Sequence, residues 1–261
     1  MSEAKASDSP CGLRVLVTAG AAGIGRAIAD TLAEHGARIH VCDISDEALA
    51  NCRREQPAFT ATRADVADPA QVVALFEQAE AQLGGLDVLV NNAGIAGPTA
   101  AVDEISIDDW QQAVNVNLNG QFYCAKLAAP QLRASRGRMI NMSSVAGRLG
   151  YAFRTPYAAT KWAIVGLTQS LAKELGPDGV RVNAILPGIV EGPRIEGVIA
   201  ARAKATDVDY PTMERQYLDR ISLRRMVTAQ DVANMALFLC SPAGANISGQ
   251  SLSVCGNVET L

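Results

Sequence analysis

The 261-residue chain is poor in aromatic residues and histidine, and it has no long apolar run. Only 5% of its residues are aromatic, so Ala, Val, Leu and Ile must fill its core, and two histidines argue against a histidine-based metal centre. No apolar run reaches the roughly 20 residues that a membrane helix needs. Lys and Arg never cluster beyond two or three residues and the net charge is −4, which argues against nucleic acid as a partner.

No Cys-x-x-Cys pair occurs among the six cysteines, several of which lie in apolar segments. This pattern favours buried free thiols in a reducing cytosol over a disulfide framework or a metal site, so we expect a cytoplasmic protein. The first residues, "MSEAKASDSPCG", are polar and lack the apolar core of a signal peptide. We expect residues 1–12 to form a disordered tail.

Apolar, strand-like segments alternate with helix-like segments along the rest of the chain. Strands are predicted at 13–18, 37–43, 58–65, 86–94, 137–144, 179–188 and 250–254. Helices are predicted at 24–36, 46–55, 69–83, 108–134 and 157–175, and another opens at a capping pattern in 228–231. The alternation predicts an α/β fold, a Rossmann-type doubly wound parallel sheet of seven strands with helices on both faces. Residues 13–261 are expected to form one domain, in which 189–227 is an irregular to helical substrate-loop region.

The stretch "VTAGAAGIGRAIAD" places Gly20, Gly23 and Gly25 between a predicted strand and a predicted helix. Ligands of such sheets bind beyond the carboxyl ends of the strands. Glycines there let the backbone approach a pyrophosphate, and the helix N-terminus supplies free N–H groups. A plain glycine turn would have the same residues, so this motif alone does not decide between the two.

Asp43 ends the second predicted strand, 18 residues past Gly25. A carboxylate there accepts both ribose hydroxyls of a dinucleotide and repels a 2′-phosphate; the alternative is a solvated aspartate that caps the next turn. Ala22 precedes Gly23, where a basic residue could bind a 2′-phosphate. These residues predict NAD rather than NADP. Asp65, which ends the third predicted strand, could accept from the adenine amino group or cap the helix that follows.

The segment "YAATK" places Tyr157 and Lys161 four residues apart, on one face of a predicted helix. A neighbouring ammonium lowers the pKa of a phenol from about 10, which suits acid/base chemistry on an alcohol–ketone pair. Ser144, thirteen residues upstream, could hydrogen-bond the same substrate oxygen, and Ser143 is its rival. An amphipathic helix that merely contains Tyr and Lys is the other interpretation.

Taken in order, the motifs resemble those of the short-chain dehydrogenase/reductase family over nearly the whole chain. They are "TAGAAGIG", Asp65, "NNAG" (91–94), "NVNLNG" (115–120), "SSVAG" (143–147), "YAATK" (157–161) and "PGIVEGP" (187–193). The resemblance implies that Tyr157 is the general acid/base and that Lys161 lowers its pKa and binds the nicotinamide ribose. It also implies that Ser144 holds the substrate oxygen and that Asn117 holds a water in a proton relay. The implied NAD-binding residues are Gly20, Gly23, Ile24, Gly25, Asp43, Asp65, Val66, Asn92, Ala93, Gly94, Tyr157, Lys161, Pro187, Gly188 and Val190.

Two positions depart from the family pattern. Ala19 stands where the family turn usually has its first glycine, and Gly192 stands where the family often has a threonine that contacts the carboxamide. Because alanine is small and Gly20 follows it, we expect the cradle to survive with a slightly moved backbone. The carboxamide contact is not carried over to Gly192.

Substrate-facing residues are expected between Ser144 and Tyr157 and in the segment after the sixth strand. Tyr151, Arg154 and Arg148 lie in the first of these, and Arg194 lies in the second. An arginine in the cavity could bind a carboxylate or sulfonate bidentately. The alternative for Arg194 is an ion pair with a nearby glutamate, Glu191 or Glu196.

We therefore expect an NAD-dependent oxidoreductase that interconverts a secondary alcohol and a ketone, or a sugar hemiacetal and a lactone. The expected substrate is small and polar, with carboxylates and sulfonates included. A 3-oxoacyl or ketone reductase and a non-catalytic NAD-sensing regulator are the alternatives. The resemblance also implies a homotetramer in which the helices at 108–134 and 157–175 pair between subunits, and the end "SVCGNVETL" is apolar enough to join that packing.

Overall fold

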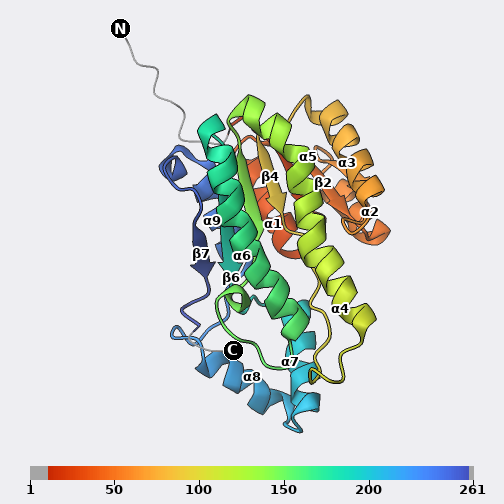
Figure 1. Cartoon of the computed structure of the whole chain (residues 1–261), viewed down its shortest axis with the longest axis vertical. Helices are drawn as coiled ribbons and strands as arrows, with labels where there is room; N and C mark the ends of the chain where they lie inside the picture. The colour runs from red at the N-terminus through yellow and green to blue at the C-terminus, as the bar shows by residue number, and fades with distance from the viewer. Residues whose placement is uncertain (1–10, 259–261) are drawn as a thin grey trace.

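A seven-stranded parallel sheet forms the centre of the molecule in the computed structural model, which describes residues 11–258 (Figure 1). Most of the predicted tail and the last three residues therefore lie outside the described residues. The strand order is β3-β2-β1-β4-β5-β6-β7. The strands are β1 Arg14–Thr18, β2 Arg38–Asp43, β3 Thr60–Arg63, β4 Val88–Asn91, β5 Arg138–Met142, β6 Arg181–Pro187 and β7 Ser251–Val254. The predicted Rossmann-type sheet is confirmed, and its order reverses between β1 and β4.

Helices cover both faces of this sheet. The helices are α1 Gly23–Glu34, α2 Asp46–Glu55, α3 Pro69–Leu83, α4 Ile107–Val114, α5 Gly120–Ser135, α6 Thr155–Leu175, α7 Pro193–Ala205, α8 Tyr210–Asp219 and α9 Ala229–Cys240. One apolar core lies under α1, α2 and α9, and a second core lies under α3 and α5 and the end of α6. Among the described residues, no helix has both the length and the apolar character to cross a membrane.

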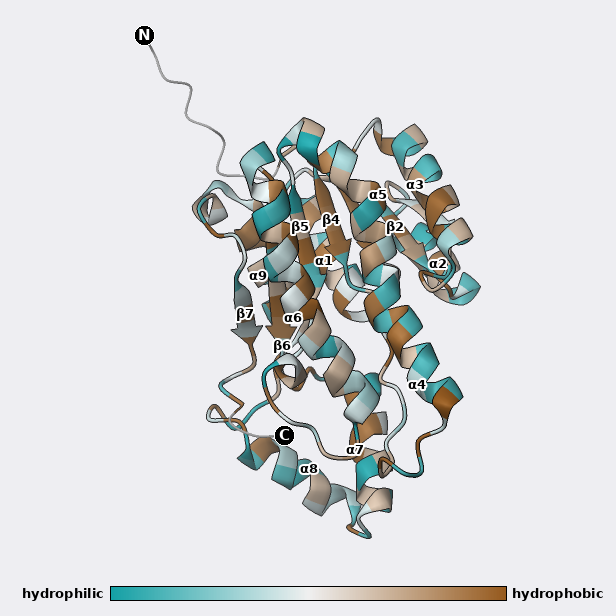
Figure 2. Ribbon diagram, viewed as in Figure 1, coloured by the Kyte–Doolittle hydropathy of each residue, from teal (hydrophilic) through white to brown (hydrophobic). Residues whose placement is uncertain are grey.

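The strands are apolar on both of their sides because each side meets a helix layer. Val15 and Val17 of β1 enter the first core, and Leu16 between them enters the second. All three are fully buried. Figure 2 shows the central strands as largely hydrophobic, with the hydrophilic residues gathered on the outer sides of the helices. The six cysteines are free thiols, four of them buried.

The structure corrects one expectation about the helices and gives detail to another. The predicted helix at 108–134 is two helices, α4 and α5, joined by a π-helical segment at Asn115–Asn119. Such segments are rare and occur mostly at functional sites. The segment at 189–227 forms two helices, α7 and α8, which lie beyond the end of the sheet at the bottom of Figure 1. They share a small core of their own with the loop after β5.

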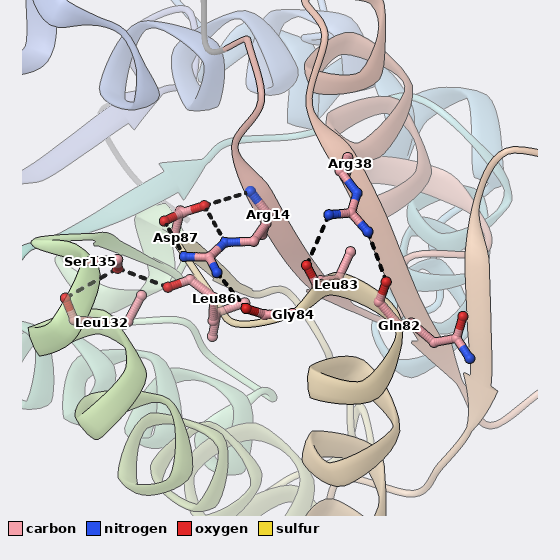
Figure 3. Close-up of polar contacts among 9 residues, drawn as sticks. All are labelled: Arg14, Arg38, Gln82, Leu83, Gly84, Leu86, Asp87, Leu132 and Ser135. Atoms are coloured by element: carbon pink, nitrogen blue, oxygen red, sulfur yellow. Dashed lines mark hydrogen bonds and ion pairs between the residues drawn. The ribbon is translucent and has the colours of Figure 1, made fainter.

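The amino ends of the strands are held by arginines that bind backbone and carboxylate oxygens (Figure 3). Arg14 on β1 donates from Nε and Nη2 to the two carboxylate oxygens of Asp87, at 2.8 and 2.9 Å. Its Nη1 donates to the Gly84 carbonyl at 2.6 Å. Arg38 on β2 donates to the carbonyls of Leu83 and Gln82, which end α3 and need donors. These contacts fix the edge of the sheet opposite the carboxyl ends of the strands.

We predict that Asp87→Asn lowers the free energy of unfolding by about 1–3 kcal/mol, because it leaves the half-buried guanidinium of Arg14 without a carboxylate. The side chains are 28% and 16% exposed, so solvent screens part of the effect. Burial raises the pKa of Asp87, but the hydrogen bonds and charge of Arg14 outweigh it and hold that pKa below 3.8. The stabilisation is therefore present above pH 4 or so and is lost as the pH falls through the folded pKa.

Urea unfolding at neutral pH and at about pH 3 measures this difference. Kinetic constants serve as the control, since Asp87 lies at the far edge of the sheet from the ligand end. Equal stability of the two proteins at neutral pH would contradict the prediction.

Candidate active site

A cleft of about 390 Å³ opens at the carboxyl ends of the strands. Most of the predicted site residues line it, although they come from segments far apart in the sequence. Of the predicted residues, the following lie in its wall: Gly23, Ile24, Asp43, Asn92, Gly94, Ser144, Tyr151, Arg154, Tyr157, Lys161, Pro187, Gly188, Val190 and Arg194. The cleft is thus at the place where such sheets bind ligands.

Gly20 and Gly25 do not line the cleft but allow the turn to pack. A Cβ atom on Gly25 would lie 2.3 Å from the Ala19 carbonyl oxygen and 2.5 Å from Nδ2 of Asn92. A Cβ atom on Gly20 would lie 2.8 Å from the Val17 carbonyl oxygen. Only glycine fits at these two positions, so their contribution to a ligand site is to shape the turn.

The departure at Ala19 is accommodated by a left-handed backbone, with φ at +47°. A non-glycine residue is disfavoured there by roughly 1–2 kcal/mol. The Ala19 carbonyl accepts a hydrogen bond from Nδ2 of Asn92 at 3.0 Å, which holds the turn in this conformation. Gly23, which follows with φ at +56°, lines the cleft, and a Cβ atom there would meet nothing within 4 Å.

The N-terminus of α1 fits a phosphate group. Its N-cap residue, Ala22, offers no side-chain cap, so the first amides of the helix point to the cleft without a side-chain acceptor. Free amides and the helix dipole together make an anion site. Asp43 lies in the wall of the same cleft, and its Oδ1 accepts from the Ser45 amide at 3.1 Å. Asp43 therefore caps the following turn and also lines the cleft. Its position is compatible with both interpretations of this residue, the turn cap and the acceptor for ribose hydroxyls.

The remaining cofactor candidates lie outside the cleft wall. Asp65 accepts the Ala67 amide on Oδ1 at 2.9 Å, and Val66 packs in the second core. The amide of Ala93 donates to Oγ1 of Thr18 at 3.0 Å. The contacts of Asp65, Val66 and Ala93 with a cofactor stay predictions.

Tyr157 and Lys161 lie one turn apart on α6, with Nζ of Lys161 5.6 Å from the centre of the Tyr157 ring. Lys161 is buried and donates to the Met142 carbonyl at 2.8 Å. Burial alone raises the pKa of Tyr157, but the charges of Lys161 and Arg194, a hydrogen bond with Ser144 and the charge of Arg154 together bring it below its ordinary value of 10. Burial lowers the pKa of Lys161, against the opposing effect of Tyr157. The arrangement favours a phenolate that can accept a proton.

Two adjacent serines follow β5, and their hydroxyls point to different partners. The hydroxyl of Ser143 donates to the Lys161 carbonyl at 2.7 Å and is buried there. The hydroxyl of Ser144 accepts the Ala146 amide at 3.2 Å and donates to the Pro187 carbonyl at 3.5 Å, and it also contributes to lowering the pKa of Tyr157. Both serines line the cleft, and Ser144 is the one that acts on Tyr157.

Asn117 is fully buried in the π-helical segment and holds the loop after β4. Its Oδ1 accepts the Ile95 amide at 2.7 Å, and its Nδ2 donates to the Ile95 carbonyl and to Oγ1 of Thr160. Gly94 fits between Asn117 and Lys161, since a Cβ atom there would lie 3.1 Å from Oδ1 and 3.5 Å from Nζ. The structure gives Asn117 a positioning role, and the water relay stays a prediction.

Part of the cleft wall, and a cluster of buried side chains behind Tyr151, were not predicted from the sequence. Met142, Val145, Ile189, Ile195 and Val198 add apolar surface to the cleft. Behind Tyr151, α7 contributes Arg202 and α8 contributes Tyr217, both buried. No local pattern in 189–227 marked them, because their contacts depend on how α7 and α8 pack.

The arginines named from the sequence have different surroundings in the structure. Arg148 is exposed, donates to the hydroxyl of Ser253 and the carbonyl of Ser251, and lies outside the cleft wall. Arg194 is exposed at the rim and, within residues 11–258, forms no ion pair with Glu191 or Glu196. Arg154 lines the cleft and is buried.

The fold and the cleft define a nucleotide-binding α/β oxidoreductase with a tyrosine–lysine–serine centre. A family model described as "Enoyl-(Acyl carrier protein) reductase" matches residues 19–257. The chain belongs to the short-chain dehydrogenase/reductase family.

Relatives and solved structures cover nearly the whole chain. The granaticin polyketide synthase putative ketoacyl reductase 1 of Streptomyces violaceoruber is 38% identical over 93% of this chain and 92% of its own. The 2-dehydro-3-deoxy-L-rhamnonate dehydrogenase (NAD(+)) of Sphingomonas sp. (strain SKA58) is 34% identical over 94% and 95%. The structure of NAD+-bound xylitol dehydrogenase superposes with a TM-score of 0.90 at 29% identity, over 95% of this chain and 99% of that one.

We predict that Lys161→Met moves the pH dependence of alcohol oxidation upward by at least about one pH unit and lowers the rate at neutral pH by more than about tenfold. The cause is loss of the cation that lowers the pKa of Tyr157. A profile of kcat/KM against pH measures the shift. Lys173→Met, at the exposed last turn of the same helix, is the matched control. An unchanged midpoint in the Lys161 variant would contradict this role.

Proposed function

We propose that this protein is an NAD-dependent dehydrogenase that interconverts a secondary alcohol and a ketone, or a sugar hemiacetal and a lactone, on a small polar substrate. The observation that carries the proposal is the convergence of Ser144, Tyr157 and Lys161 with the uncapped N-terminus of α1 and Asp43 in one cleft. The similar rhamnonate dehydrogenase is an NAD(+) enzyme and the similar xylitol dehydrogenase structure is NAD+-bound, which supports the cofactor and a polar substrate.

Three side chains of the cleft have separate roles in the proposed reaction. Ser144 holds the substrate hydroxyl, and the Tyr157 phenolate accepts its proton. Lys161, held by the Met142 carbonyl, stabilises the phenolate before the proton moves. NAD, when bound, would supply the acceptor for the hydride of the carbinol carbon. The alcohol thereby loses a hydride and a proton and becomes a ketone.

The α1 N-terminus and Asp43 would hold the dinucleotide. The free amides of the helix suit the pyrophosphate, and the Asp43 carboxylate suits the hydroxyls of the adenosine ribose. Pro187, Gly188 and Val190, which follow β6 in the cleft wall, suit the nicotinamide side.

A 3-oxoacyl or ketone reductase is the second candidate, because the ketoacyl reductase of S. violaceoruber is 38% identical to this chain. We also propose a homotetramer. Its support here is three exposed aromatic side chains, Trp110, Phe122 and Trp162, on α4, α5 and α6, the helices that the family resemblance implicates in subunit pairing.

We predict that the protein reduces NAD with at least one compound in a panel of sugars, polyols, hydroxy acids and hydroxy sulfonates, and that Tyr157→Phe removes nearly all turnover. The phenyl ring keeps the packing but cannot take the proton. NADH absorbance measures turnover, and quenching of protein fluorescence by NADH measures binding. Retained binding with lost turnover identifies an enzyme. If no compound is oxidised and 3-oxoacyl thioesters are reduced, the second candidate replaces the first.

We predict a KM for NAD at least about tenfold below that for NADP, and we predict that Asp43→Ser reduces this ratio. The carboxylate repels the 2′-phosphate of NADP and accepts from the ribose hydroxyls of NAD, and serine does neither as strongly. Asp46→Ser, at the exposed start of α2, is the control for a general change of surface charge. A wild-type preference for NADP would refute the assignment.

A further inference from the structure

Arg154 is a buried arginine in the wall of the cleft that no acidic side chain neutralises. It is 2% exposed. Its Nη2 donates to the Ala96 carbonyl at 2.7 Å, while Nε and Nη1 have no hydrogen-bond partner. In the part of the chain that the structure describes, no carboxylate lies within ion-pair distance of it. Buried charges are almost always paired, because an unpaired one loses its hydration without compensation.

Aromatic rings hold Arg154 in place on two sides. Its guanidinium carbon lies 5.1 Å from the centre of the Tyr157 ring and 5.3 Å from that of Tyr151. The guanidinium carbon of Arg202 lies 5.5 Å from the centre of the Tyr151 ring and 5.8 Å from that of Tyr217. The hydroxyls of Tyr151 and Tyr217 are hydrogen-bonded at 2.8 Å. We call these five residues the arginine–tyrosine stack.

The stack fixes the guanidinium but leaves its hydrogen-bonding edge free. Contact with a ring uses the flat face of a guanidinium, whereas its N–H groups lie in the plane and match a carboxylate or sulfonate. Nε and Nη1 of Arg154 carry N–H groups without an acceptor, and they lie on different edges of the group. A two-point contact with an oxyanion would therefore pair either of them with the second N–H of Nη2, whose first N–H is bound to the Ala96 carbonyl.

The charges around this end of the cleft are also unbalanced. Arg154, Lys161 and Arg194 line it, while the carboxylates in its wall are Asp43, which ends β2, and Glu191, which is exposed. Arg202, behind the wall, is buried and has an idle Nη1 as well. Neither carboxylate forms an ion pair with Arg154, so an anionic ligand would supply the partner that this guanidinium lacks.

We propose that Arg154 binds an anionic group of the substrate, a carboxylate or a sulfonate, and that the substrates are hydroxy acids and their oxo counterparts. This inference rests on the proposed function, since it assigns the substrate class of the same site. The guanidinium lies beside the ring of Tyr157, so one small molecule can reach Arg154 with its anion and Tyr157 with its hydroxyl.

Binding of a non-reacting anion tests the assignment without turnover. The full chain with NAD bound is titrated with propionate, propane-1-sulfonate and propionamide by calorimetry. We expect at least one anion to bind about tenfold or more tightly than the amide, and Arg154→Gln to remove the difference. Arg148→Gln, an exposed arginine from the same loop and outside the cleft wall, should preserve it.

Turnover supplies the second readout, with matched neutral compounds. The pairs are 3-hydroxybutyrate with 3-hydroxybutyramide and trans-4-hydroxycyclohexanecarboxylate with its carboxamide. For an acid that is oxidised, we expect Arg154→Gln to raise KM by about 10- to 100-fold with a smaller fall in kcat, and to leave the KM of the amide within about threefold. A structural role alone would affect acid and amide alike.

The outcomes separate this inference from the proposed function. If alcohols are oxidised but acid and amide are equivalent in the wild type, the inference is overturned and the proposed function stands. If anions bind through Arg154 but no alcohol is oxidised, the inference stands and the proposed function fails. Should Arg154→Gln not fold, the wild-type comparison still decides, and Arg154→Lys, which keeps one charge and loses the two-point contact, should show a reduced preference for the anion.

Discussion

The buried ammonium of Lys161 is the charge around which the site is arranged. It is 3% exposed and meets one described hydrogen-bond acceptor, the Met142 carbonyl at the end of β5. A buried cation with so little compensation is stabilised when a neighbour becomes negative. Tyr157 is that neighbour, so the cation whose burial costs free energy lowers the pKa of the phenol that must react. The backbone carbonyl of the same lysine accepts the hydroxyl of Ser143, whereas Ser144 contributes to lowering the pKa of Tyr157.

The order of the strands explains why these groups meet. β4, β5 and β6 are neighbours in the sheet, and the loops that follow them carry Gly94, Ser144 and Gly188 to one place. The π-helical segment then brings Asn117 close to Lys161, with Gly94 between them. Side chains of one loop also bind the backbone of another, as Asn92 binds the Ala19 carbonyl. Preorganisation of the catalytic centre is thus a property of the sheet edge as a whole.

Apolar periodicity predicted the sheet because it is a local signal, whereas most of the cleft wall was implied by the resemblance of the motifs to those of the short-chain dehydrogenase/reductase family. Neither predicted the division of 108–134. The segment "NVNLN" contains no proline or glycine, and nothing in its propensities distinguishes a π-helical turn from an α-helical one. Nor did they predict the stack of Arg154, Tyr151 and Arg202, since that contact joins residues about fifty positions apart through the packing of α7.

The burial of an arginine side chain decides how much it gains by binding an anion. The spacing of residues in the sequence does not predict this burial. Arg194 follows the loop after β6, and its place in the sequence makes it the obvious candidate, yet it is exposed at the rim. An exposed guanidinium is hydrated whether or not a ligand is present, so an anion gains little by replacing that water. Arg154 has already lost its water, and its idle N–H groups are compensated only when an anion arrives. We therefore infer that the difference in binding free energy between an anionic and a neutral ligand comes mainly from Arg154.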